Sequence, residues 1–274
     1  MSCLPGTIPY PVIKIDGKNN EIITVEDPVI EEITLALFLN GQELITMSAS
    51  VGEEEFLAAG FLAAEGIINE AGEIKSIEAD RVNGIIRVET HKEETIPEKL
   101  FLKRCLTACR GKGRNEYSFT GDDFTIKKTK GSVFLTPRDI MVYSQMLEDN
   151  SRLFHATGGV HGGALAENGR FILLSFDIGR HNVFDKIYGR CLLEGIPTQN
   201  RIMVFTGRVS TEILIKLSKM NIPVIIACSA PTSLALGMAE ALDITVVGFA
   251  RGERMNIYTH PHRVILNPAN DVVT

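Results

Sequence analysis

Short runs rich in β-branched and aromatic residues, separated by turn residues, dominate the first third of the chain. Residues 33–39 and 43–48 are two such runs, and they flank Asn40-Gly41, the dipeptide that most strongly favours a two-residue hairpin turn. Residues 84–89 predict a further strand. The pattern indicates an antiparallel unit at the amino end of the chain.

A helix is predicted between these strands. Residues 53–65 carry its apolar positions, and Ser50-Val-Gly-Glu53 has the spacing of a capping box that would open it. Gly60 lies inside this helix, where glycine costs about 1 kcal/mol relative to alanine. We therefore expect close packing around Gly60 to offset that cost.

The pattern changes in the second half, where continuous apolar runs alternate with helical stretches. Such runs are typical of strands that are buried on both faces of a sheet. The runs are residues 171–176, 202–205, 223–227 and 244–247, and the helical stretches are residues 183–193, 210–220 and 231–242. A further helix is predicted to begin at Thr136, with Pro137 in its first turn. This alternation predicts an α/β domain in which helices cover the faces of the sheet.

Two domains are expected from these patterns. A polar stretch at residues 122–131 separates them, so the boundary is placed near residue 130. Residues 1–130 would form the smaller antiparallel α+β domain, and residues 131–274 the α/β domain.

Composition narrows the class of protein. The chain has 274 residues, 45% of them hydrophobic and 23% charged, as in ordinary globular proteins. Its formal net charge of -6 argues against nucleic acid as the main partner. We find no secretory signal and no run of about 20 apolar residues that would span a membrane. The 5 cysteines are too few and too scattered for a disulfide framework, which predicts a cytoplasmic protein with reduced thiols.

Two cysteines, Cys105 and Cys109, lie within a segment that is dense in cations. That segment, residues 103–114, reads K-R-C-L-T-A-C-R-G-K-G-R. Nearby cations lower a thiol pKa from its usual value of roughly 8.5 and favour the nucleophilic thiolate. Gly111 and Gly113 predict a mobile loop. We favour reactive thiols here over an exposed basic loop with incidental cysteines.

The junctions that follow the apolar runs of the second half are rich in polar groups. In an α/β sheet, ligands bind at the carboxyl ends of the strands, where helix amino termini and arginines suit anions. The junctions carry Arg180, His181, Arg208, Ser229, Arg251 and Arg254. They predict a site for a nucleotide-like anion, and the alternative is that these residues are helix caps and surface arginines.

A glycine-rich stretch, residues 156–163, places His161 between two pairs of glycines. It matches neither the Walker A pattern nor the dinucleotide-binding glycine pattern. His161 could contact a ligand or act as a base, although this stretch taken alone favours a structural or solvent-facing histidine. Because the chain has no C-x-x-C, and His161 is followed by Gly162 and Gly163 in place of the x-Glu of a zinc deaminase, we expect no zinc site. Cys191 and Cys228 are predicted to be small buried apolar residues.

Several of these stretches together resemble the formate dehydrogenase accessory sulfurtransferase family (FdhD). The resemblance lies in D-I-G-R-H-N-V-F-D-K from residue 177, T-G-R-V-S-T-E from residue 206, S-A-P-T from residue 229 and G-F-A-R from residue 248. A-T-G-G-V-H from residue 156 and L-A-A-G-F-L-A-A-E-G-I-I from residue 57 fit it as well. The similarity runs in order from about residue 28 to residue 262.

The resemblance implies a sulfur carrier. Members take sulfur from a cysteine desulfurase as a cysteine persulfide. They deliver it to the molybdenum or tungsten cofactor of formate dehydrogenase, which carries two molybdopterin guanine dinucleotides. It further implies a three-layer, cytidine-deaminase-like carboxy-terminal domain without zinc, a homodimer, and the formate dehydrogenase apoprotein as partner. GDP should mimic the cofactor at a site formed by His161, Arg180, His181, Arg208, Ser229, Phe249, Ala250, Arg251, Gly252, Glu253 and Arg254.

One feature departs from the family. Its cysteines commonly follow a C-x-x-C pattern, whereas this chain has C-L-T-A-C. Cys109, which precedes G-K-G-R, aligns best with the family cysteine, so we expect it to carry the persulfide and Cys105 to assist. Two other functions stay open: a cofactor-binding chaperone without sulfur chemistry, and a thiol redox sensor that forms a Cys105–Cys109 disulfide.

Overall fold

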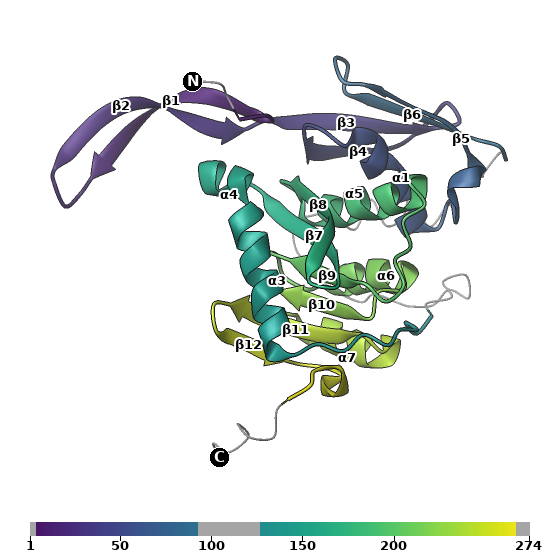
Figure 1. Ribbon diagram of the computed structural model, residues 1–274. Coiled ribbons are helices and arrows are strands. Elements are labelled where there is room, and N and C mark those ends of the chain that lie inside the picture. Colours follow the sequence, from purple (N-terminus) through teal and green to yellow (C-terminus); the bar gives the residue numbers. More distant parts are fainter. Residues whose placement is uncertain (1–3, 93–126, 267–274) are drawn as a thin grey trace.

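The computed structural model in Figure 1 describes residues 4–92 and 127–266. A two-stranded ribbon and a four-stranded sheet precede the gap, and a six-stranded sheet with helices follows it. The predicted loop at residues 103–114 lies outside the described residues. Within the described ranges, no helix has the length and apolar character needed to cross a membrane.

The four-stranded sheet has the strand order β4-β3-β6-β5. Its strands are β3 (Glu32–Leu39), β4 (Gln42–Ser50), β5 (Ile74–Asp80) and β6 (Ile85–Thr90). Asn40 and Gly41 form the turn between β3 and β4 with φ values of 49° and 79°. Positive φ at both positions matches the twist of the strands, so the predicted hairpin is confirmed.

The helix α1 (Glu54–Glu65) follows β4, but the predicted capping box is wrong. Ser50 is the last residue of β4, and its hydroxyl accepts a hydrogen bond from the backbone N–H of Ile178 at 3.0 Å. Glu53 accepts a hydrogen bond from the Ser175 hydroxyl at 2.6 Å. Ser50 and Glu53 therefore bond to residues distant in sequence, Ile178 and Ser175, in place of capping α1.

Gly60 lies where α1 crosses α5 (Arg180–Leu193). A Cβ atom on Gly60 would lie 1.8 Å from the carbonyl oxygen of Asp185, and one on Gly189 would lie 1.9 Å from that of Phe56. The two helices thus meet backbone to backbone, which confirms the expected close packing at Gly60 and identifies α5 as its partner. Figure 1 shows both helices between the four-stranded and six-stranded sheets.

The six-stranded sheet has the order β12-β11-β10-β9-β7-β8. Its strands are β7 (His161–Glu167), β8 (Arg170–Asp177), β9 (Ile202–Phe205), β10 (Val224–Ala227), β11 (Thr245–Arg251) and β12 (Arg254–Ile257). The strands β9, β10 and β11 are parallel, and the others are antiparallel to their neighbours. The strands β9 and β10 are buried throughout, as predicted, but β8 is an edge strand whose burial alternates.

Helices cover both faces of this sheet and complete three layers. Met203, Phe205 and Ile225 pack toward α5, α6 (Thr211–Lys219) and α7 (Ser233–Leu242). Ile202 and Val204 point to the opposite face, where α3 (Pro137–Asn150) packs. The short helix α4 (Arg152–Thr157) follows α3. The expected layered α/β architecture is confirmed.

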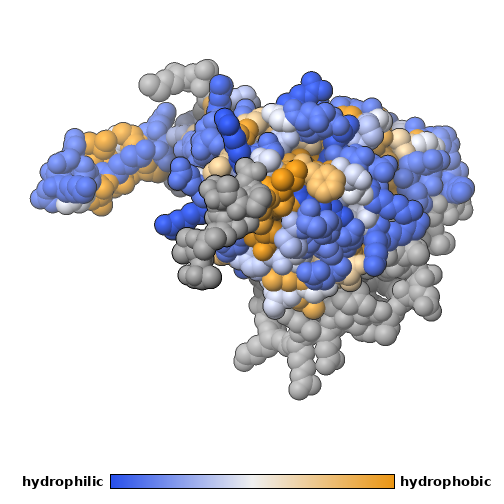
Figure 2. Space-filling model, turned by 60° about the horizontal axis from the view of Figure 1, so that its bottom comes forward, coloured by the Kyte–Doolittle hydropathy of each residue, from blue (hydrophilic) through white to orange (hydrophobic). Residues whose placement is uncertain are grey.

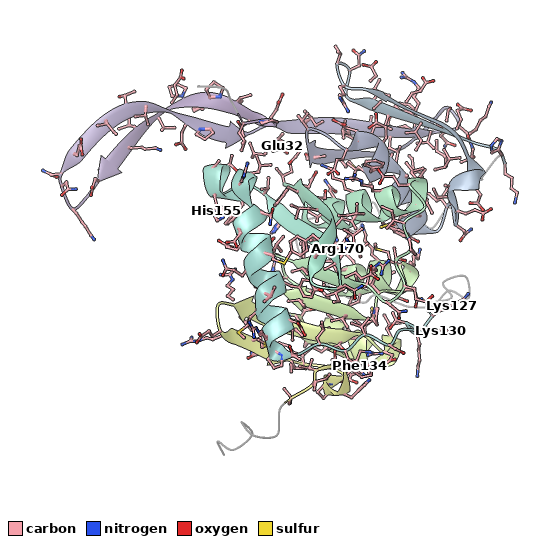
Figure 3. The ribbon with its side chains drawn as sticks, in the orientation of Figure 1. Glu32, Lys127, Lys130, Phe134, His155 and Arg170 are labelled. Carbon is pink, nitrogen blue, oxygen red and sulfur yellow. The ribbon has the colours of Figure 1, made fainter. Side chains whose placement is uncertain are left out.

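The segment that leads into α3 runs past the ends of α6 and α7. Lys127 and Lys130, labelled in Figure 3, mark its course. The backbone N–H of Thr129 donates to the carbonyl of Leu242 at 2.9 Å. Thr136 and Asp139 form the capping box of α3, which confirms the predicted helix start. The domain boundary near residue 130 stays a prediction.

Replacing Gly60 with alanine should lower the free energy of unfolding by about 1–3 kcal/mol, the usual cost of overpacking. The cost arises because the added methyl group has no room against the backbone of α5. Urea-induced unfolding followed by circular dichroism measures it. Gly237→Ala in α7 is the matched control, because a Cβ there meets nothing within 4 Å. It should be neutral or stabilising, and equal effects of the two substitutions would contradict the close helix contact.

Candidate functional site

The candidate site lies at the end of the six-stranded sheet where the parallel strands β9, β10 and β11 finish. The loops after β9 and β10 and the end of β11 meet there, together with the start of α5. Because β7 runs antiparallel to β9, its first residue, His161, lies at the same end of the sheet. Carboxyl ends of neighbouring strands are the usual place for ligands in such sheets.

Backbone and hydroxyl hydrogen bonds join these loops one to the next. The N–H of Gly162 donates to the hydroxyl of Thr206, and the N–H of Thr206 donates to the carbonyl of Gly162, both at 3.0 Å. The Ser229 hydroxyl donates to the carbonyl of Thr206 at 2.9 Å. The N–H of Phe249 then donates to the carbonyl of Ser229 at 3.3 Å. The loops therefore form one continuous rim, in which Ser229 acts as a bridge.

His161 sits half-buried in this rim, with its ring centroid 6.1 Å from that of Phe205. Burial lowers the pKa of His161, the positive charges of Arg180, His181 and Arg208 lower it further, and Asp177 opposes them. The imidazole is thus held neutral in cationic surroundings, where one ring nitrogen can accept a hydrogen bond.

Gly207 faces the same rings. A Cβ atom at this position would lie 2.6 Å from the Phe205 ring and 3.4 Å from Nδ1 of His161. Glycine is therefore favoured after Thr206, because a side chain there would displace the buried Phe205 ring.

His181 pairs with Glu212, which lies in the first turn of α6. The distance from Nε2 of His181 to Oε2 of Glu212 is 3.0 Å. The hydrogen bond from His181 lowers the pKa of Glu212 against the opposing effect of burial, and the charges of His181, Arg180 and Lys216 add to the lowering. The pair fixes the orientation of the His181 ring at the junction of α5 and α6.

A fully buried ion pair lies directly beneath Arg180 and His181. Asp177 and Lys186 are 0% and 1% exposed, and their charged atoms are 2.7 Å apart. Asp177 also accepts hydrogen bonds from the backbone N–H of Ser50 at 3.1 Å and of Gly179 at 2.8 Å. The start of α5 is thereby tied to the last residue of β4 in the other sheet.

A second buried pair joins α5 to α6. Nζ of Lys216 lies 2.5 Å from Oδ1 of Asp185 and donates to the carbonyl of His181 at 3.4 Å. Burial raises the pKa of Asp185, and the charge of Lys216 and its hydrogen bond act against this effect. The first pair fixes the start of α5, which carries Arg180, and the second fixes α6, which follows the loop that carries Arg208.

The end of β11 contributes the remaining predicted residues. Phe249 is exposed and has a φ of 52°, which is rare for a bulky residue and typical of functional sites. Ala250 is buried, and its carbonyl accepts a short hydrogen bond from the Ser144 hydroxyl. Arg251 and Gly252 begin the hairpin to β12. Glu253 and Arg254, which follow, line an open groove with Pro137, Met255, Asn256, Ile257 and Leu266.

Cys228 follows β10 directly and lies half-buried beside this hairpin. Burial raises its pKa, while Ser144 and Arg251 lower it. Cys191 in α5 is buried, and burial is the largest influence raising its pKa to about 12. The prediction of buried apolar cysteines is confirmed for Cys191, whereas Cys228 sits at the rim instead of within the strand.

The arrangement suits an anionic ligand. The starts of α5 and α6 bring backbone N–H groups, Arg180 and Arg208 together around a neutral imidazole. Among the residues that the structure describes, no cluster of His, Cys, Asp or Glu side chains is placed to hold a metal ion. Cys105 and Cys109 lie outside the described residues, so the structure does not relate them to this rim.

Several residues of the rim were not among the predicted site residues. Glu212, Thr206 and Asp185 stand in the same motifs as the predicted arginines and histidines, and Lys216, which pairs with Asp185, lies four residues beyond T-G-R-V-S-T-E. The signal for Glu212 was present, because it stands in the first turn after T-G-R-V-S, where an acidic residue favours a helix start.

Comparisons with known proteins agree with this architecture. The model of the FdhD/NarQ family matches residues 30–265. A sulfur carrier protein FdhD from Bacillus subtilis is 40% identical over 247 residues, which cover 90% of this chain and 94% of that protein. The protein of the same name from Bacillus pumilus is 42% identical over 238 residues, covering 87% of this chain and 90% of that protein.

A solved structure shares the fold along nearly the whole chain. It is described as a formate dehydrogenase accessory protein from Desulfotalea psychrophila, and it matches with a TM-score of 0.76 and 26% sequence identity. The match covers 95% of this chain and 100% of the solved one. The family match and the extent of these identities lead to one conclusion: the chain belongs to the FdhD/NarQ family.

Proposed function

We propose that this protein is a sulfur carrier for formate dehydrogenase. It takes sulfur from a cysteine desulfurase as a persulfide and delivers it to the molybdenum or tungsten bis-guanine-dinucleotide cofactor of that enzyme. The observation that carries the proposal is the 40% identity, over 90% of the chain, to a relative named as a sulfur carrier. The paired cysteines and the anion-binding rim provide the two chemical parts that such a carrier needs.

Sulfur loading requires only thiol exchange. The Cys109 thiolate attacks the terminal sulfur of the desulfurase persulfide, the S–S bond to the desulfurase cysteine breaks, and that cysteine leaves as a thiolate. Cys109 then carries the persulfide, and no oxidant or reductant is consumed. Arg110, Lys112 and Arg114 follow Cys109 in sequence and supply positive charge that favours the anionic, nucleophilic forms.

The rim of the six-stranded sheet would hold the guanine dinucleotide part of the cofactor. Arg180 and Arg208 suit its phosphates, and the N–H groups at the starts of α5 and α6 add to the same attraction. The exposed ring of Phe249 offers a surface for a base, and the hairpin that begins at Arg251 lies next to it. The metal centre of the bound cofactor would supply the atom that accepts the sulfur.

The proposed partners follow from this role. They are the cysteine desulfurase that donates sulfur, the formate dehydrogenase apoprotein that receives the cofactor, and a second copy of this chain. A cytoplasmic location is part of the same proposal, because free thiols are kept reduced there.

A second candidate is a cofactor-binding chaperone without sulfur chemistry. The feature that favours it is the rim itself, whose hydrogen bonds and supporting buried ion pairs join residues far in sequence from Cys105 and Cys109. The two candidates differ in their need for the cysteines, so a variant that lacks both thiols separates them.

GDP should bind to the purified protein, and Arg180→Ala and Arg208→Ala should each weaken binding by about tenfold or more, the usual loss for one charge-assisted hydrogen bond. Isothermal titration calorimetry measures the affinity. Arg170→Ala is the matched control, because Arg170 begins β8 and lies at the end of the sheet opposite to the candidate site. If GDP produces neither heat of binding nor thermal stabilisation of the parent protein, the nucleotide site is contradicted, while the proposed sulfur transfer is unaffected.

Incubation with a desulfurase and cysteine should add one sulfur to the peptide that contains Cys105 and Cys109. Cys109→Ala should abolish the added mass, and Cys105→Ala should retain at least part of it. Mass spectrometry of the digested protein reports both results. Cys191→Ala is the control, since a buried thiol with a pKa of about 12 should not be loaded.

The reverse result for the two single variants would make Cys105 the carrier. If the double variant still supports formate dehydrogenase maturation, the sulfur-carrier proposal fails and the chaperone takes its place.

A further inference from the structure

A β-bulge interrupts β11 where this strand reaches the rim. Gly248 lies opposite Asn256, and Arg251 lies opposite Arg254. Three steps along β11 thus face two steps along β12, so β11 has one extra residue at this point. Bulges bend a strand and turn a side chain in a new direction, and they are common next to functional sites.

The bulge changes which side chain of β11 enters the core. Val246 packs toward α5, α6 and α7, whereas Val247 packs toward α3. Side chains alternate along a regular strand, so Phe249 would share the α3 face with Val247. Ala250 lies on that face instead, buried in the same cluster as Val247, and Phe249 is 47% exposed. The extra residue therefore directs a phenylalanine out of the core at the rim.

The exposed Phe249 is unfavourable in two ways. Its φ of 52° is rare for a bulky residue, and its ring would be more stable if it were buried. Figure 2 shows a mostly hydrophilic surface on which apolar side chains gather in only a few places. A strained residue persists where neighbouring groups hold it in place. The direction of the Phe249 ring therefore depends on the groups that hold the bulge.

Two hydrogen bonds from outside the β11–β12 hairpin hold the bulge. The N–H of Phe249 donates to the carbonyl of Ser229 at 3.3 Å. The carbonyl of Ala250, the next residue, accepts a hydrogen bond from the hydroxyl of Ser144. One bond thus comes from the loop after β10 and the other from α3. The first joins two backbone groups, whereas the second depends on one side chain.

Ser144 stands in the buried stripe of α3, the helix that crosses the strands of the six-stranded sheet in Figure 1. The stripe has the spacing of one helix face and consists of Ile140, Tyr143, Ser144 and Leu147. Sγ of Cys228, which follows β10, lies 3.9 Å from the Ser144 hydroxyl. A buried hydroxyl is costly unless it forms a hydrogen bond, so the Ala250 carbonyl is the partner that Ser144 needs.

We propose that Ser144 is a positioning residue. Its hydroxyl fixes the bulge of β11 and so turns the Phe249 ring outward, where the ring stacks on the base of the nucleotide-like ligand. The contact with the base rests on the proposed function. The direction of the ring rests only on the strand register and on the hydrogen bond from Ser144 to Ala250.

A tryptophan in place of Phe249 reports the direction of the ring, because the chain has no tryptophan of its own. Acrylamide should quench the fluorescence of Phe249→Trp readily. Adding Ser144→Ala should lower the quenching constant and shift the emission to shorter wavelength, because the bulge then loses a bond that holds the ring outward. Unfolding would not produce this decrease, since it exposes the tryptophan to water.

Ser218→Ala is the matched control for Ser144→Ala. Ser218 is also a buried serine on a helix, and its hydroxyl likewise donates to a backbone carbonyl, that of Lys127, at 2.6 Å. Its substitution removes the same kind of hydrogen bond away from the bulge. It should leave the quenching of Phe249→Trp unchanged.

Calorimetric titration with GDP and with inorganic pyrophosphate separates contacts to the base from contacts to the phosphates. Ser144→Ala should weaken GDP binding by about fivefold or more, the loss expected when one base loses an aromatic stacking partner. It should leave pyrophosphate binding unchanged. Phe249→Ala should have the same two effects. The double variant should lose no more GDP affinity than Phe249→Ala alone, because Ser144 acts through the ring.

A tryptophan that is shielded in Phe249→Trp alone would overturn the proposal without any change at Ser144. Equal quenching with and without Ser144→Ala would overturn it as well. So would additive losses of GDP affinity in the double variant, or an equal loss in Ser218→Ala. If the parent binds no GDP while the quenching results hold, the proposed nucleotide site fails and the role of Ser144 in directing the ring stands.

Discussion

The structure depends most on the ion pair between Asp177 and Lys186. Both side chains are out of contact with water, so removing either would leave an uncompensated buried charge, which costs about 3–5 kcal/mol. Asp177 satisfies its remaining acceptor capacity with the backbone N–H groups of Ser50 and Gly179 and with the amide of Asn182. One carboxylate therefore holds the end of β4, the end of β8 and the first turn of α5 in one arrangement.

The candidate site takes its rigidity from this arrangement. Arg180 and His181 follow Asp177 by three and four positions, so their backbone is set by the same hydrogen bonds. The pair of Asp185 with Lys216 joins α5 to α6, and α6 carries the Glu212 that orients His181. Positive groups held in place before a ligand arrives lose little entropy when they bind it, which favours recognition of phosphate.

The two halves of the chain also make contact at two glycines, which have no side chains. At Gly60 and Gly189 the helices α1 and α5 approach backbone to backbone, and α5 is the helix whose first turn forms part of the rim. The amino-terminal half thus contacts α5 and the junction before it twice, through Gly60 of α1 and through Ser50 of β4. The helix that carries Arg180 is consequently supported along its length by the amino-terminal half of the chain.

The sequence by itself determined the features that depend on neighbouring residues: the Asn40-Gly41 hairpin, the Thr136 cap, and the central strands with arginines at their ends. Turn chemistry and apolar periodicity act over a few residues and can be seen without the fold. Only the tertiary structure decided that Ser50 and Glu53 bond across to β8 and its junction in place of capping α1, and that β8 is an edge strand. It also decided that Glu212 meets His181 and that the ribbon of β1 (Thr7–Asp16) and β2 (Glu21–Ile30) extends away from the rest of the fold. Those outcomes depend on which distant groups compete for the same hydrogen bond or the same apolar surface, and that competition is resolved only when the chain is folded.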